Sequence, residues 1–180
     1  MNFRATQIRT PSFGAACERH RPRVRAVAWR LTRDATVAEE LAHESFVRLH
    51  ASMALFRQQA ALSTWLYRTV VNLCHDHART AGRSRAMVSL DDDALPTSEA
   101  LAPDLSAEAS ERTRLLDAAV HSLAPPMRDA VVLRFVSGLG YDEIAEVLGC
   151  PPGTVASRIH RALRLVGAML AAQGIQEDSL

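Results

Sequence analysis

Residues 140–163, GYDEIAEVLGCPPGTVASRIHRAL, predict two helices joined by a short turn. In the first helix, Asp142 and Glu143 suit the positive end of the helix dipole, and Gly149 closes the helix. The second helix begins at Pro152, because proline is favoured at the first helical position and biases the residue before it away from helix. Two helices separated by a turn of about four residues form a helix-turn-helix, whose second helix enters the major groove of DNA.

The second helix of this pair has one apolar side and one polar side. Val155, Ile159, Leu163 and Val166 recur at helical spacing and are predicted to be buried. The polar side brings hydroxyl and guanidinium groups to a helix N-terminus, which also favours phosphate. A merely structural helical hairpin needs no such cluster, so DNA contact is the favoured interpretation. The residues assigned to this contact are Thr154, Ala156, Ser157, Arg158, His160, Arg161 and Arg164.

Helical spacing continues on the N-terminal side of this segment. Residues 125–138 predict a helix that two prolines open and Gly138 stops, and residues 111–123 predict another before it. No segment shows convincing strand alternation, so the sequence predicts an all-α fold. Three further helices are predicted at residues 17–32, 34–53 and 64–80.

The net charge of +1 hides a strong segregation of charge along the chain. Residues 1–85 hold fourteen arginines against six acidic residues, residues 86–111 hold seven acidic residues and no basic one, and residues 112–180 balance seven against seven. The acidic middle has little periodicity, which is typical of a flexible linker, and the basic first part favours a polyanion as partner. We therefore expect two small helical domains, residues 1–84 and 112–180, joined by a flexible acidic linker at residues 85–111.

The helix predicted at residues 34–53 has an apolar stripe and an opposite face of mostly charged residues. Periodicity alone favours interpreting that second face as a solvated surface. The stripe comprises Ala38, Leu41, Ala42, Ser45, Phe46, Leu49 and Met53. The opposite face comprises Glu39, Glu40, His43, Glu44, Val47 and Arg48.

The helix predicted at residues 64–80 should turn Leu66, Val70, Leu73 and His77 towards the core. Its other face combines an aromatic ring, an amide and guanidiniums, which suits single-stranded nucleic acid because bases stack on the ring while arginine holds phosphate. The alternative is that the ring belongs to the core and the arginines are merely solvated. The row comprises Trp65, Arg68, Asn72, His75 or Asp76, and Arg79.

Three of these segments resemble a known family. Residues 140–163 look like the promoter-binding helix-turn-helix of the extracytoplasmic-function class of bacterial RNA polymerase sigma factors, whose pattern carries EIA, GTV, SR and RA at these spacings. VAEELAHESFVRLH (37–50) is similar to the family's core-polymerase-binding helix, and STWLYRTVVNLCHDHAR (63–79) to its promoter-melting and minus-ten-recognition helix. The three matches occur in the family's order, and together they are specific.

The resemblance implies a sigma factor that binds core RNA polymerase, melts promoter DNA and directs promoter-specific initiation. It implies that the charged face at residues 39–48 binds polymerase and that the row at residues 65–79, together with Arg57, binds the minus-ten single strand. The second domain would read the minus-thirty-five element, and an anti-sigma factor would be the regulatory partner. In the family the linker runs towards the RNA exit path, where a basic channel would suit Asp91, Asp92, Asp93, Glu99 and Asp104.

Four positions depart from the family pattern. Val37, His43 and His50 stand where members often have Asp, Gln and Trp, and they bear on polymerase affinity and its pH dependence. Ala156 stands where a basic residue is common, which removes one expected DNA contact.

Two other classes of protein fit parts of the sequence. A helix-turn-helix regulator that works without polymerase should have a sensor or dimerisation domain, whereas this first domain is rich in arginine. A small metal-dependent hydrolase could be built on residues 74–77, Cys-His-Asp-His, but consecutive helical residues point about 100° apart and do not converge on one ion. We therefore expect no enzymatic activity, metal or cofactor.

The sequence also predicts where the protein resides. No apolar run approaches the roughly 18 residues of a membrane span, and the N-terminus lacks the apolar run of a secretory signal. The three cysteines show no CxxC spacing. We expect a cytoplasmic protein with no membrane insertion.

Overall fold

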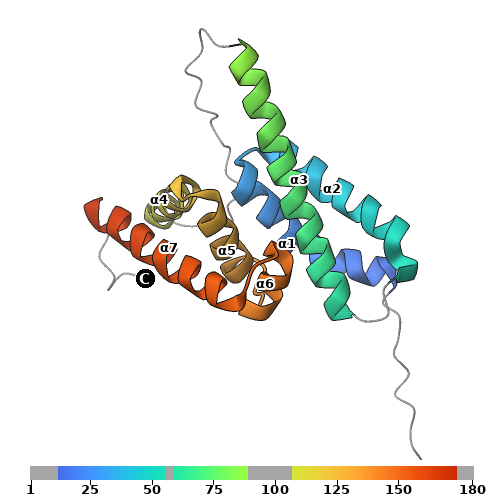
Figure 1. Cartoon of the computed structure of the whole chain (residues 1–180). Helices are drawn as coiled ribbons and strands as arrows, with labels where there is room; N and C mark the ends of the chain where they lie inside the picture. The colour runs from blue at the N-terminus through green and yellow to red at the C-terminus, as the bar shows by residue number, and fades with distance from the viewer. Residues whose placement is uncertain (1–11, 56–58, 89–106, 174–180) are drawn as a thin grey trace, which may run out of the picture.

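A computed structural model describes residues 12–55, 59–88 and 107–173. These residues form α-helices and one short 3-10 helix and contain no strand, so the predicted all-α fold is confirmed (Figure 1). The first half contains α1 (Phe13–Thr32), α2 (Ala35–Ser52), η1 (Met53–Leu55) and α3 (Gln59–Val88). The second half contains α4 (Ala107–Ser122), α5 (Pro125–Phe135), α6 (Tyr141–Leu148) and α7 (Pro152–Ala172).

Side chains and turns fix the ends of the helices near the positions that the sequence predicts. The Asp34 carboxylate caps α2 by accepting from the Val37 amide at 3.0 Å. The Gly140 amide donates to Glu143 at 2.8 Å at the start of α6, and Gly149 ends that helix with a φ of 62°. α7 begins at Pro152, as predicted. α3 extends to Val88 and α4 begins at Ala107, so both helices run into the segment predicted as linker. The acid-rich run at residues 91–104 lies outside the described residues.

The core of the first half is built from the stripes predicted on α2 and α3, with one error. Ala38, Ala42, Ser45, Phe46 and Leu49 are buried, and so are Leu66, Val70 and Leu73. His77, predicted to face the core, is exposed. The reason is that α3 projects beyond the body of the protein (Figure 1), and every described side chain from Asp76 to Gly82 is exposed.

The buried stripe of α7 was also predicted with one error. Val155, Ile159 and Val166 are buried as expected, but Leu163 is 46% exposed and Ala162 is fully buried in its place. Successive residues in a helix point about 100° apart, so Leu163 and Ala162 cannot both face the core. Leu163 is the more apolar of the two residues, but Ala162 is the one that lies on the same side of α7 as Val155, Ile159 and Val166.

The two helical halves pack against each other. α3 contacts α6, and α1 contacts α4 and α5. One continuous apolar cluster includes Val24, Leu66 and Val71 from the first half and Val132 and Ile144 from the second. A smaller cluster, which includes Ala119 and Leu123, belongs to the second half alone.

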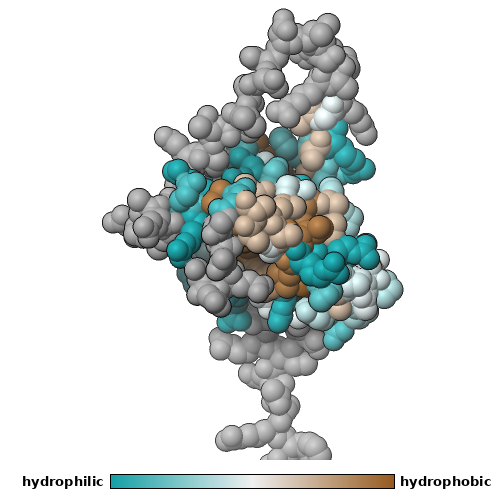
Figure 2. Space-filling model, turned by 90° about the vertical axis from the view of Figure 1, so that its left-hand side faces the viewer, coloured by the Kyte–Doolittle hydropathy of each residue, from teal (hydrophilic) through white to brown (hydrophobic). Residues whose placement is uncertain are grey.

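Polar and apolar side chains are mixed on the surface. Seen from the side where α4 and α7 lie at the left of Figure 1, apolar side chains gather near the middle with hydrophilic ones around them (Figure 2). None of the described helices combines the length and apolar composition that a membrane span requires.

Candidate nucleic-acid interface

The polar side of α7 is an exposed, basic surface. Ser157, His160, Arg161 and Arg164 are all exposed, and they lie opposite the stripe that includes Val155. The Ser157 hydroxyl donates to the Thr154 carbonyl at 2.9 Å, so its oxygen keeps a lone pair for an outside donor. Thr154 and Ala156 are half-exposed at the edges of this surface.

Arg158 lies apart from that surface. It is half-buried, and its guanidinium is 3.5 Å from the Cys150 sulfur in the turn between α6 and α7. It also lines a cavity of about 280 Å³ between the two halves, together with Asn72 and His75 of α3. Of the seven residues assigned to DNA contact on α7, four are exposed, Thr154 and Ala156 are half-exposed, and Arg158 lines the cavity shared with α3.

The face of α3 predicted to bind a single strand is exposed over part of its length. Arg68, Asn72 and Arg79 are exposed, and Arg79 donates to Asp76 on the same helix. Trp65 is half-buried and packs against the core, so its ring is partly core, as in the alternative interpretation. Arg57 lies outside the described residues.

The second half of the protein contacts this face of α3 at several points. The Arg68 guanidinium donates to the Glu146 carbonyl in α6. The His75 imidazole Nε2 lies 3.0 Å from the carboxylate of Asp129, a buried residue of α5. The pairing raises the pKa of His75 above its usual value, chiefly through the hydrogen bond to Asp129, while partial burial acts in the opposite direction.

We expect His75→Gln to destabilise the protein more at about pH 6 than at about pH 9. Since the pKa of His75 is raised in the folded state, its contribution is fully present below the unfolded pKa of about 6.5 and is lost as pH rises through the folded pKa. The effect should stay below about 1 kcal/mol, because 43% of the His75 side chain is exposed. Urea denaturation of both proteins at the two pH values measures it. The exposed His77→Gln serves as control, and an equal loss at both pH values would contradict the assignment.

The charged face predicted on α2 is exposed. Glu39, Glu40, His43 and Arg48 are exposed, and Glu44 is half-exposed and bonds to Arg48 at 2.8 Å. In the same face Val47 is 49% exposed, an apolar side chain among charged ones. A mixed surface of this kind suits a protein partner with basic and apolar groups.

The residues considered for a metal-dependent hydrolase do not converge. Cys74 is buried, and burial, with Asp129 nearby, raises the pKa of its thiol to about 12, which keeps the thiolate form rare. His75 turns to Asp129 in α5, whereas Asp76 and His77 are exposed. Within the described residues no three potential ligands are grouped as a metal site requires.

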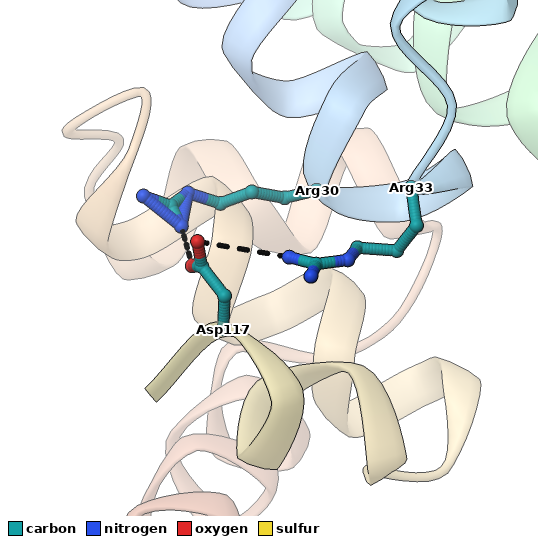
Figure 3. A network of polar contacts seen from close by, with 3 residues as sticks. All are labelled: Arg30, Arg33 and Asp117. Carbon is teal, nitrogen blue, oxygen red and sulfur yellow. Dashed lines mark hydrogen bonds and ion pairs between the residues drawn. The ribbon is translucent and has the colours of Figure 1, made fainter. Parts of the chain in front are cut away.

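One polar cluster between α1 and α4 has no counterpart among the features predicted from the sequence. Asp117 of α4 has only 7% of its side chain exposed, and it pairs with Arg30 and Arg33 at the end of α1 (Figure 3). The Arg33 guanidinium also lies over the Trp29 ring, 4.6 Å from its centroid. No local pattern marks these residues as partners, because Arg30 and Asp117 are 87 positions apart.

Two protein-family models match the chain, one in the first helical half and one in the second. Residues 17–84 match "Sigma-70 region 2" and residues 113–166 match "Sigma-70, region 4". Among solved structures, the sigma factor RpoE of Bartonella quintana, crystallised with the anti-sigma factor NepR, is 24% identical with a TM-score of 0.73, over 88% of this chain and 96% of that chain. CnrH, solved with the cytosolic domain of CnrY, is 21% identical with a TM-score of 0.67, over 89% and 88% of the two chains. These two structures share the fold.

Curated relatives are similar over most of the chain. The ECF RNA polymerase sigma factor SigE of Mycolicibacterium smegmatis is 36% identical over 92% of this chain, which spans 64% of that relative's length. The RNA polymerase sigma-H factor of Pseudomonas aeruginosa is 35% identical over 78% of this chain and 77% of its own length. The ECF RNA polymerase sigma-E factor of Haemophilus influenzae is 32% identical over 71% of each. The chain therefore belongs to the ECF family of RNA polymerase sigma factors, which bind core RNA polymerase and direct transcription initiation at promoters.

Proposed function

We propose that three helix faces divide the work of initiation in this sigma factor. The charged face of α2 binds core RNA polymerase, the row on α3 binds the unpaired minus-ten strand, and the exposed side of α7 reads the minus-thirty-five element. The observation that carries the proposal is that these faces are exposed, wholly or in part, on the segments that match sigma region 2 and region 4. The two domains proposed are residues 1–84 and 112–180, with the acidic segment between them as linker.

The assignment on α3 is supported by the chemistry of its exposed groups. The Asn72 amide can donate to and accept from a base edge, and Arg68 can hold a phosphate once it is released from the Glu146 carbonyl. Trp65 is half-buried and packs against the core, and a base is proposed to stack on the exposed part of its ring face. Arg57 completes the set proposed from the sequence.

The assignment on α2 is supported by the position of Val47. The apolar side chain can be buried against a partner, and the charged side chains around it can form ion pairs that fix how the partner is aligned on the helix. The six residues proposed for polymerase contact are Glu39, Glu40, His43, Glu44, Val47 and Arg48.

The remaining parts of the proposal concern partners and location. An anti-sigma factor is the proposed regulator, supported by the fold shared with the sigma factor RpoE, which was solved with the anti-sigma factor NepR. The protein is proposed to act in the cytoplasm, where polymerase and promoters are found, and to catalyse no reaction of its own.

We expect Arg161→Ala to cost about 1 to 3 kcal/mol of promoter binding by the holoenzyme and to relax preference at one minus-thirty-five position, as loss of a base contact does. Arg164→Ala, if it removes a phosphate contact, should weaken binding to all sequences alike and reduce the salt slope by about one. Transcription from a library of minus-thirty-five variants at two salt concentrations measures both effects. Arg114→Ala is the matched control, because Arg114 has 69% of its side chain exposed on α4. If both α7 variants behave like this control, α7 does not contact DNA.

A further inference from the structure

Opposite charges join the two halves at the end of α1. The Asp117 carboxylate accepts from Arg30 through one oxygen, and its other oxygen lies 3.6 Å from an Arg33 nitrogen (Figure 3). Arg33 has a φ of 59°, a conformation that residues other than glycine seldom adopt. Its guanidinium is held between the Trp29 ring and Asp117, so contacts on both sides stabilise this conformation.

The same packing engages part of the α3 face. Arg68 is engaged by the Glu146 carbonyl, His75 by Asp129, and Asn72 opens onto the cavity that Arg158 of α7 also lines. Because α6 and α5 engage Arg68 and His75, a nucleic-acid strand cannot contact both of these side chains in this arrangement, whereas Asn72 is exposed. By contrast, Glu39, Glu40, His43 and Arg48 of the α2 face are exposed, and Val47 in the same face is 49% exposed.

The arrangement is also too short to span a promoter. Elements named for positions −10 and −35 lie about 25 base pairs apart, which is about 85 Å along B-form DNA at about 3.4 Å per base pair. Here α3 and α7 line one cavity, and α7, with 21 residues, is only about 30 Å long. The two halves must therefore separate before both can contact their DNA elements.

We infer that the chain forms a closed, self-masked state, in which the pairing of Asp117 with Arg30 and Arg33 acts as a latch that keeps the second half over the α3 face. This inference rests on the proposed role of that face. Polymerase engages α2 first, since the charged face of α2 is exposed in the closed state, and the whole minus-ten face becomes available only when the halves separate.

Asp117→Asn tests the latch in the full-length chain. It removes the negative charge that two arginines share and keeps the shape of the side chain. Glu111→Gln is the matched control, because Glu111 lies on the same helix and forms an ion pair with Arg114 one turn away, at 4.0 Å. Arg30→Gln removes the latch from the other half, so it must reproduce the effect of Asp117→Asn. Circular dichroism establishes that each variant is folded.

Two measurements are made on each variant. Small-angle X-ray scattering should show a larger radius of gyration for Asp117→Asn and Arg30→Gln than for the wild type and Glu111→Gln. Fluorescence anisotropy with a short mixed-sequence single-stranded DNA should show about tenfold tighter binding by the two latch variants, the factor expected when an open state of about one tenth becomes dominant. Affinity for core polymerase should stay within about twofold.

The outcomes separate this inference from the proposed function. Adding Asn72→Ala to Asp117→Asn should abolish the gained binding, because that gain comes from the uncovered α3 face. Latch variants that stay as compact as the wild type, or that expand without any gain in single-strand binding, overturn the inference. If the gain persists with Asn72→Ala, masking of α3 is wrong. If transcription by the holoenzyme is also unaffected by Asn72→Ala, the proposed role of α3 fails as well.

Discussion

Val47→Asp is expected to weaken binding to core RNA polymerase by about a hundredfold, or about 3 kcal/mol, and to reduce transcription accordingly. Val47 is 49% exposed in the charged face of α2, so the free protein should tolerate the change. In the complex, the new carboxylate would be desolvated within the contact without a partner, one helical turn from the acidic Glu44.

Competition with labelled wild-type protein for core polymerase measures this effect. Leu116→Asp is the matched control, because Leu116 is an apolar residue of α4 with 38% exposure and lies outside the proposed contact. If Val47→Asp competes as well as the control, the α2 face is not the polymerase-binding surface.

Asn72→Ala is expected to reduce open-complex formation by about ten- to a hundredfold, which corresponds to about 1 to 3 kcal/mol for the loss of contacts to one unpaired base. Polymerase binding should be unchanged, because Asn72 lies on α3 and the proposed polymerase contact lies on α2. The side chain is exposed, so the variant should fold normally.

Permanganate footprinting of the melted region measures open-complex formation, and a polymerase pull-down measures assembly. His77→Ala is the control, because His77 is exposed on the same helix at a different angle from the proposed row. Normal melting by Asn72→Ala would remove this face from the DNA interface. Trp65→Ala is less informative, since loss of its packing against the core also reduces stability.

The sequence predicted the helices well because their ends carry strong local preferences. Pro152, Gly149 and Glu143 each act through contacts within a few residues, and such contacts can be inferred from spacing alone. The stripes failed at two positions: at His77 the periodicity was extended past the covered part of α3, and at Leu163 the neighbouring Ala162 faces the core instead.

Contacts between the halves could not be predicted in the same way. Helical periodicity tells which side of a helix is apolar, but it does not identify what covers that side. Asp117 and Asp129 meet partners far away in the sequence, and Arg158 lines a cavity together with residues of α3; nothing near them in the chain marks these arrangements. The sequence therefore predicted two helical domains joined by a linker and the exposed faces of their helices. It did not predict that the second domain packs over part of the proposed DNA-binding face of α3.

The most direct test of the central claim is run-off transcription from a promoter library with core RNA polymerase, with and without the purified chain. We predict specific start sites only when both are present, because neither small domain alone offers enough contacts for tight promoter binding. Nanomolar binding of a promoter by the chain alone, with no further gain in binding or transcription from polymerase, would contradict the account and identify a polymerase-independent regulator.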